Sequence, residues 1–140
     1  RQLYDSILVP PAVLRELAAG PFESEEEYLA HFEIEDLLQV GAPGHSGRAE
    51  AEHLDPGERE AIALAFECDL PLLIEEESGR AVARELEIRI SGIAGQLLRA
   101  VREETVGVAQ ASRMLAELRR KGRINQQVFE SVKRALDEGA

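Results

Sequence analysis

Acidic side chains stand at two places where the chain is predicted to pass between a strand and a helix. Glu58 falls in the first turn of a predicted helix that Asp55 caps. Glu75 and Glu76 follow residues 70–74, an apolar run too short for a helix and therefore predicted as a buried strand. Ligands of open parallel sheets bind at the carboxyl ends of strands. If the helix start and the strand end meet there, their carboxylates form a pocket suited to Mg²⁺ or Mn²⁺.

A fourth candidate, Glu16, lies two turns along a helix that follows another short apolar strand. That strand ends with residues 7–9, and Pro10 and Pro11 stop it and open the helix. The simpler interpretation is a solvent-facing glutamate. Both interpretations of Glu16 are open at this point.

Glycines and a cysteine supply the other residues that could take part in chemistry. Gly92 and Gly95 lie in a predicted strand-to-helix turn whose N–H groups could cradle a phosphate, although close helix packing also explains them. Cys68 is the only cysteine, so the chain cannot form an internal disulfide and a reducing cytoplasm is expected. We expect Cys68 to be a buried helix residue. His45 and His53 lack the spacing of zinc ligands.

The charge of the chain is unevenly distributed. The net charge is −11 over 140 residues, and residues 23–36 contain seven Asp or Glu and no Lys or Arg. The basic residues of the last third are Arg113, Arg119, Arg120, Lys121, Arg123, Lys133 and Arg134. Both regions can be solvated helix faces. Alternatively, the first is an acidic surface for a basic partner and the second a basic surface for phosphate. The sequence contains no apolar run of the roughly 20 residues that span a bilayer, so no membrane partner is expected.

The order of predicted elements indicates an α/β fold with a parallel sheet. Strands are predicted at residues 3–9, 37–40, 70–74 and 88–90, with helices between them and three helices at the end. A loop is predicted over residues 41–48, and residues 78–80 lead into the helix before the last strand. The length suits one domain with a sizeable core.

Several segments together resemble the PIN-domain nuclease superfamily. Residues 7–17 resemble its second strand and the helix that follows, and residues 57–65 and 70–76 resemble its later core. The chain is most similar to a prokaryotic subgroup of predicted nucleic-acid-binding proteins, with the same Gly-Glu-x-Glu-Ala-Ile helix and a helical extension like residues 108–138. The resemblance implies a three-layer fold, a short parallel sheet flanked by helices. It implies an α/β core over residues 1–105 and a helical extension, residues 106–140, packed on the same domain.

The resemblance also implies a function. Many PIN domains, including the VapC-type toxins of toxin–antitoxin pairs, are ribonucleases that depend on Mg²⁺ or Mn²⁺. The metal would polarise the scissile phosphate and lower the pKa of an attacking water. Glu16, Glu58 and Glu76 fall on the family's acidic positions and are the expected catalytic residues. The expected metal ligands are Glu16, Glu58, Glu75 and Glu76. Gly92, Gly95 and Arg80 are expected to bind RNA, and an antitoxin is a possible protein partner.

Three departures from the family pattern support a different function. The family's first strand, which carries an Asp ligand, has no counterpart from Arg1 onward. Glu75 and Glu76 stand where the family usually has Asp, and Ile93 stands where it usually has Thr. The alternative is a catalytically impaired PIN-like module that binds nucleic acid or protein. A third reading is a truncated chain without activity. The missing strand would leave a sheet edge uncovered, so a homo-oligomer or a partner strand is expected.

Overall fold

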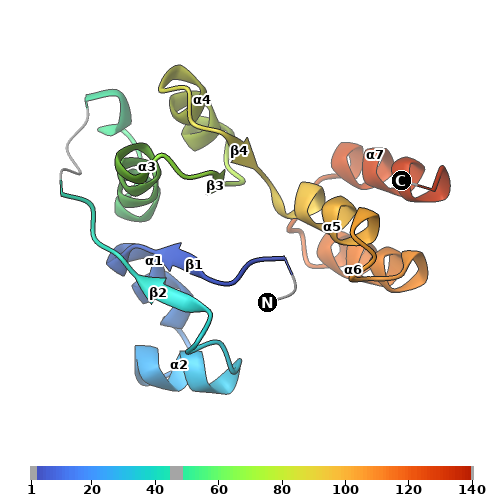
Figure 1. Cartoon of the computed structure of the whole chain (residues 1–140), viewed down its shortest axis with the longest axis horizontal. Helices are drawn as coiled ribbons and strands as arrows, with labels where there is room; N and C mark the ends of the chain where they lie inside the picture. The colour runs from blue at the N-terminus through green and yellow to red at the C-terminus, as the bar shows by residue number, and fades with distance from the viewer. Residues whose placement is uncertain (1–2, 45–48, 140) are drawn as a thin grey trace. The chain divides into compact units, whose positions relative to one another are not determined.

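The computed structural model describes residues 3–44 and 49–139 and has the predicted alternation of strands and helices. The first half contains β1 (Ile7–Val9), α1 (Pro11–Ala18), α2 (Glu25–His31), β2 (Leu38–Val40) and the 3₁₀ turn η1 (Ala49–Ala51). Next come α3 (Pro56–Cys68), β3 (Leu72–Leu73), α4 (Glu77–Glu85) and β4 (Ile90–Ser91). The last elements are α5 (Ile93–Arg102), α6 (Val108–Arg120) and α7 (Gln126–Asp137). The fold is therefore α/β with a helical C-terminal part, as predicted (Figure 1).

The chain groups into two compact units, residues 3–90 and residues 91–140. Helix α5 belongs to the second unit, where it packs against α6 and α7 (Figure 1). We had placed this helix in an α/β core ending at residue 105. The packing of residues 106–140 on that core stays a prediction.

The strands form two separate pairs. Strands β1 and β2 pair in parallel, with Ile7 opposite Leu38 and Val9 opposite Val40. Strand β3 pairs with β4, and the amide of Leu72 donates to the carbonyl of Arg89 at 2.8 Å. Among the described residues no hydrogen-bonded ladder joins the two pairs. The strands are also shorter than predicted, and β3 begins only after Pro71, which has no N–H to donate.

Helix α3 is the centre of the first unit's core. Ile62 is fully buried, and the small side chain of Ala65 is buried beside it. The same cluster contains Ala51, Leu54, Leu72, Ile74, Val82 and Ala83, so it joins α3 to η1, β3 and α4. The two ends of α3 lie where predicted: Asp55 caps its start and Asp69, with φ of 52°, caps its end. The prediction that Cys68 is buried is wrong, because it is exposed at the C-terminal end of the helix.

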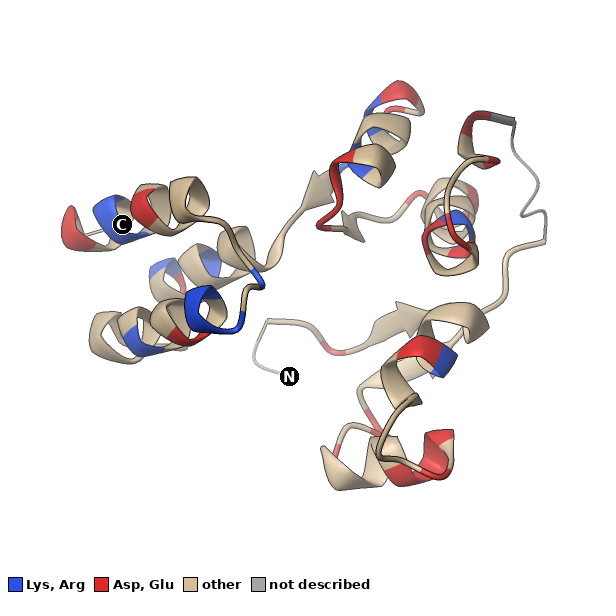
Figure 2. Ribbon diagram, turned by 180° about the vertical axis from the view of Figure 1, so that it is seen from behind, with Lys and Arg blue, Asp and Glu red and all other residues tan. Residues whose placement is uncertain are grey.

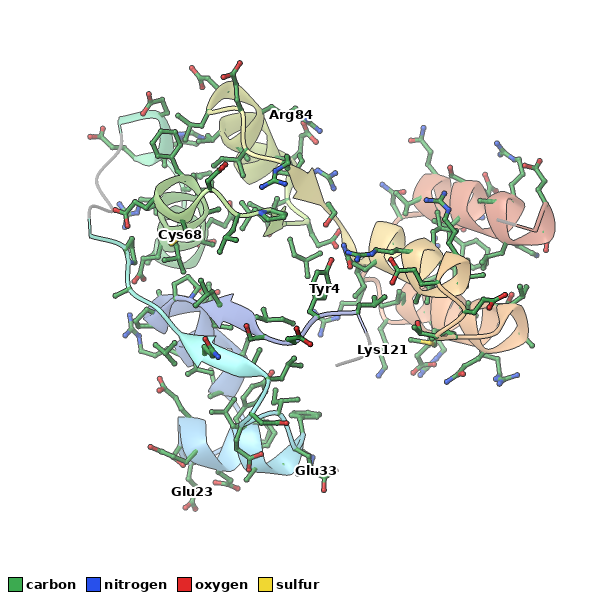
Figure 3. All side chains as sticks on the ribbon, in the orientation of Figure 1. Tyr4, Glu23, Glu33, Cys68, Arg84 and Lys121 are labelled. Atoms are coloured by element: carbon green, nitrogen blue, oxygen red, sulfur yellow. The ribbon has the colours of Figure 1, made fainter. Side chains whose placement is uncertain are left out.

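The segment from Pro21 to Val40 contains no buried residue. Its helix α2 begins as predicted, with the Ser24 hydroxyl accepting from the amide of Glu27 at 3.1 Å. The aromatic rings of Phe22, Tyr28 and Phe32 contact one another at centroid distances of 5.2 to 5.9 Å. Figure 3 labels Glu23 and Glu33, which flank this helix and are both exposed. The α2 segment is therefore a partly covered layer outside the core.

The second unit has a core of its own. Its buried residues are Leu97, Val101, Ala111, Leu115, Ile124, Val132 and Leu136. Asn125 caps α7 as predicted, since its side-chain oxygen accepts from the amide of Val128 at 2.8 Å. Among the described residues, no helix is long and apolar enough to cross a membrane.

Acidic residues occupy the left-handed backbone region at four helix ends. These residues are Glu33 (φ 55°), Asp69 (φ 52°), Glu87 (φ 59°) and Glu104 (φ 57°), which end α2, α3, α4 and α5. Glycine is the residue that favours this conformation at a helix end.

Candidate acidic site

Glu58 occupies the third position of α3 and is held by the cap that begins the helix. The Asp55 carboxylate accepts a hydrogen bond from the Glu58 amide at 2.9 Å. The carboxylate of Glu58 points to the start of α4, and its Oε2 atom is buried without a hydrogen-bond partner among the described residues. A buried carboxylate oxygen without a donor is costly, and it marks a position where a cation or a proton would be stabilised.

Glu58 is protonated more readily than an ordinary glutamate. Burial raises its pKa from 4.5 to about 7, and the neighbouring negative charges of Asp55 and Glu76 add to this effect. When protonated, its O–H can donate to the Asp55 or Glu76 carboxylate, which raises the pKa further. Near neutral pH, Glu58 therefore changes charge.

Gly79 makes the close approach of α4 to Glu58 possible. A Cβ atom at this position would lie 2.8 Å from Glu58 Oε2 and 2.5 Å from Ile74 Cδ1. Residues 78–80, which the sequence places at the entry to a helix, lie within the first turn of α4, which begins at Glu77. Gly79 fits the crowded start of this helix.

Glu16 reaches the start of α3 from α1. Its carboxylate lies against Gly57, so that a Cβ atom at position 57 would be 2.6 Å from Oε1 and 3.0 Å from Oε2. Gly57 precedes Glu58 in the first turn of the helix, where the helix dipole favours negative charge. The Glu16 residue as a whole is exposed. The structure thus brings Glu16 to the same helix end as Glu58.

Glu76 approaches the same place from the start of α4, whereas Glu75 does not act on Glu58. Glu76 is the N-cap residue of α4, but its side chain makes no capping hydrogen bond, and its negative charge contributes to the raised pKa of Glu58. Glu75 is exposed and is not among the groups that shift Glu58. Within residues 3–44 and 49–139, no three His, Cys, Asp or Glu side chains are arranged to hold a metal ion together.

The residues at this site fit a divalent cation in charge and in ligand type. The groups that could ligate a metal are all carboxylates. Among the described residues, none donates a hydrogen bond to the buried Oε2 of Glu58. Burial and the negative charges of Asp55 and Glu76 raise the pKa of Glu58, and a cation would offset both effects.

Three residues of the site were missed from the sequence. We interpreted Asp55 only as a helix cap, although its charge also acts on Glu58. Gly57 and Gly79 were not assigned a role, and each allows a carboxylate to approach a helix backbone. The signal for Asp55 was its spacing of three residues from Glu58, which places both side chains at one helix end.

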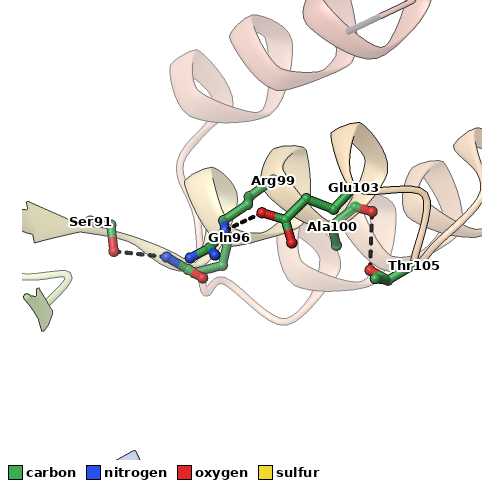
Figure 4. A network of polar contacts seen from close by, with 6 residues as sticks. All are labelled: Ser91, Gln96, Arg99, Ala100, Glu103 and Thr105. Carbon is green, nitrogen blue, oxygen red and sulfur yellow. Dashed lines mark hydrogen bonds and ion pairs between the residues drawn. The ribbon is translucent and has the colours of Figure 1, made fainter. Parts of the chain in front are cut away.

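The predicted phosphate-binding glycines lie at the start of α5, in the second unit. Gly92 is the N-cap residue of α5, and Gly95 lies in its first turn. Figure 4 shows the polar contacts beside them: the Gln96 amide donates to the Ser91 hydroxyl at 3.0 Å, and Arg99 pairs with Glu103 at 2.7 Å. A Cβ atom at Gly95 would meet nothing within 4 Å, so close packing does not explain this glycine.

The remaining candidates are Arg80, His45 and His53. Arg80, in the first turn of α4, has a buried Nε atom without a hydrogen-bond partner among the described residues. His53 is exposed, and His45 lies outside the described residues, as does most of the predicted loop at residues 41–48. The role of Arg80 in RNA binding stays a prediction.

Comparison with protein families gives one match. The model of the family DUF3368, described as a PIN domain, matches residues 1–138. No curated protein and no solved structure matches the chain.

Proposed function

Since the chain belongs to the PIN-domain family, we propose that it is a metal-dependent ribonuclease. The proposed catalytic residues are Glu16, Glu58 and Glu76, with Glu75 as a further metal ligand. The observation that carries the proposal is the Glu58 carboxylate, whose buried Oε2 lacks a donor while Asp55 and Glu76 act on it. Glu16 and Glu76 come from two other helices and end near the same turn of α3.

The proposed metal is Mg²⁺ or Mn²⁺. When bound, it would polarise a phosphodiester and lower the pKa of an attacking water. Glu58 would hold it through Oε2, which has no hydrogen-bond partner in the described part of the chain. Glu16 and Glu76 would supply further carboxylate oxygens from α1 and α4.

The protein side chains also determine the pH range in which the site would bind a cation. Below pH 7 most Glu58 carboxyl groups carry a proton, since burial and the charges of Asp55 and Glu76 raise the pKa to about 7. A cation competes with that proton for the same oxygens. The Glu58 amide donates to the Asp55 carboxylate at 2.9 Å and holds it in its capping position beside the site.

We also propose a biological setting. The substrate is RNA, with Gly92, Gly95 and Arg80 in its binding, and the enzyme acts as the toxin of a toxin–antitoxin pair in the cytoplasm. The family match supports a nuclease-like fold in general. The toxin role rests on the resemblance to VapC-type proteins.

A second function is favoured by one specific observation. Among the described residues no three side chains are arranged to hold a metal ion. A PIN-like module that binds nucleic acid or a protein without cleaving RNA would need no such arrangement. This alternative predicts stable association without turnover.

Titration calorimetry with Mn²⁺ separates the two functions. The full chain is compared with Glu58→Gln, and Glu60→Gln serves as the matched control, because Glu60 lies on the same helix but not among the groups that act on Glu58. The nuclease predicts saturable binding that is lost in Glu58→Gln and kept in Glu60→Gln, followed by Mn²⁺-dependent cleavage of RNA. A folded chain that binds no Mn²⁺ and leaves varied RNAs intact would exclude the nuclease and favour the binding module.

A further inference from the structure

The two units of the chain carry opposite charge. Residues 3–90 contain 21 Asp or Glu and six Lys or Arg, whereas residues 91–140 contain nine Lys or Arg and six Asp or Glu. Figure 2 shows the difference, with Lys and Arg concentrated on the helices of the second unit. A polyanion such as RNA would be repelled by the first unit as a whole and attracted by the second.

Within the second unit, the positive charge is greatest where α6 passes into α7. Four cations occupy five consecutive positions there, and all are exposed: Arg119, Arg120, Lys121 and Arg123. We call these four residues the basic turn. Figure 3 labels Lys121, which follows the last residue of α6. From residue 113 to residue 134 the chain has seven Lys or Arg and only two Glu.

Contacts within the protein compensate the positive charges of the basic turn only in part. Arg119 donates to the Gln126 side-chain oxygen at 2.9 Å, a contact that leaves its charge uncompensated. Glu117 accepts from Arg120 and pairs with Lys121 at 3.3 Å. Arg123 has no ion pair and no side-chain hydrogen bond among the described residues. Glu117 therefore pairs with two of the four cations, Arg120 and Lys121.

Favourable interaction with the α6 dipole accounts for part of this cluster. Basic residues in the last turn of a helix are stabilising, and Arg119 and Arg120 occupy that turn. The effect falls off beyond the last turn, and Arg123 lies past the helix end. Four adjacent cations also repel one another, so the dipole alone does not explain the basic turn.

We propose that the basic turn binds the phosphate backbone of RNA. The choice of RNA as the polyanion rests on the proposed ribonuclease function. A membrane surface fits less well, because membrane-binding basic segments expose large apolar side chains among their cations. Ile124, within the turn, is buried, and the exposed large apolar residues of this unit are Ile93, Val108 and Met114.

The test is the binding of a fluorescently labelled single-stranded RNA of about 20 nucleotides to the full chain, by anisotropy in EDTA, over a range of salt concentrations. The variant Arg119→Gln/Arg123→Gln should bind roughly five- to tenfold more weakly, with a salt slope smaller by about 1.4, because two phosphate contacts are lost. The matched control Arg15→Gln/Arg84→Gln makes the same change of net charge in the acidic unit and should leave the affinity and slope unchanged. Equal weakening in both variants, or none in either, would overturn the proposal.

Glu117 provides a test in the opposite direction. In the free protein Arg120 and Lys121 lower the pKa of Glu117 by hydrogen bonding and charge, so the carboxylate competes with phosphate for both cations. Glu117→Gln should therefore bind the RNA several-fold more tightly at low salt. Weaker binding by a variant that retains the wild-type circular dichroism would contradict the proposal.

The two proposals fail in distinguishable ways. Binding that depends on the basic turn, without cleavage in Mn²⁺, would support this surface and exclude the ribonuclease. Cleavage that proceeds unchanged in Arg119→Gln/Arg123→Gln would support the ribonuclease and exclude the basic turn. If the acidic unit of a second chain occupies the surface instead, sedimentation will show a dimer that RNA does not dissociate, which overturns the proposal.

Discussion

The Glu16 carboxylate lies against the backbone of Gly57, 2.6 Å from where a Cβ atom would stand. The Glu16 carboxylate could not keep this position if residue 57 had a side chain. The contact brings α1 to the start of α3 and places one acidic residue beside the helix turn that carries Glu58. It also allows the position of Glu16 to be altered without changing its charge.

The substitution Gly57→Ala should displace Glu16 and weaken Mn²⁺ binding. Glu16 is exposed and its carboxylate ends a flexible side chain, so it can swing away at little cost. Alanine also favours the helix over glycine by about 1 kcal/mol, so stability should be kept. Calorimetry and thermal unfolding measure the two effects. Gly107→Ala, where a Cβ would meet nothing within 4 Å, is the control. Unchanged Mn²⁺ affinity in Gly57→Ala would remove Glu16 from the site.

The substitution Glu58→Gln should make the protein more stable at alkaline pH. The pKa of Glu58 is about 7 in the folded chain and 4.5 as its ordinary value, so the folded state binds more protons between these values. The free energy of unfolding contributed by Glu58 therefore falls as pH rises from 4.5 to 7. Glutamine does not titrate, so it removes this loss. The free energy of unfolding of Glu58→Gln should exceed that of the unmodified chain by about 1 to 2 kcal/mol above pH 7.

Denaturant unfolding at several pH values checks this prediction. The difference between Glu58→Gln and the unmodified chain should be small below pH 4.5 and largest above pH 7. Glu60→Gln reports the effect of removing a charge elsewhere on the helix. A difference that does not change with pH would mean that Glu58 titrates as an ordinary glutamate.

The substitution Gly95→Ala should separate stability from RNA binding. The new Cβ atom meets nothing within 4 Å, and glycine inside a helix costs about 0.5 to 1 kcal/mol relative to alanine. The melting temperature should rise. If the start of α5 cradles a phosphate, the same variant should bind RNA more weakly. A rise in stability with unchanged RNA affinity would show that Gly95 does not contact the RNA.

The exposed strand edges predict self-association, in line with the homo-oligomer expected from the sequence. Leu73 on β3 is 56% exposed, and Ile7 on β1 is 39% exposed, while each strand has a single paired neighbour. A lysine on an edge strand discourages pairing with another chain. Leu73→Lys should therefore shift sedimentation toward the monomer. Leu70→Lys, an exposed leucine outside the strand, should not. The same monomer fraction in both would argue against pairing through β3.

The predictions from sequence succeeded where local signals decide the structure. Asp55, Ser24 and Asn125 cap helices as their types and positions indicate. The predictions failed where tertiary contacts decide the structure. Gly79 allows α4 to approach Glu58, and no local pattern in the sequence reveals this role.

For the acidic site, the structure brings together three carboxylates that the sequence singled out, and their catalytic role stays a prediction. Glu16 and Glu76 lie at the positions taken from the family resemblance, and both come to the start of α3. Glu75 was grouped with Glu76, although it does not act on Glu58. Adjacent residues at the start of a helix diverge in direction, and only the fold decides which of them turns inward.

The four acidic residues in left-handed conformation at helix ends are positions where a substitution could raise the thermal stability of the chain. Each has a side chain where glycine would avoid strain of about 1 kcal/mol, and each places negative charge at the negative end of a helix dipole. This strained type of helix end occurs in both units of the chain, at Glu33, Asp69, Glu87 and Glu104. Glycine at these positions should give a variant with greater thermal stability for the measurements above.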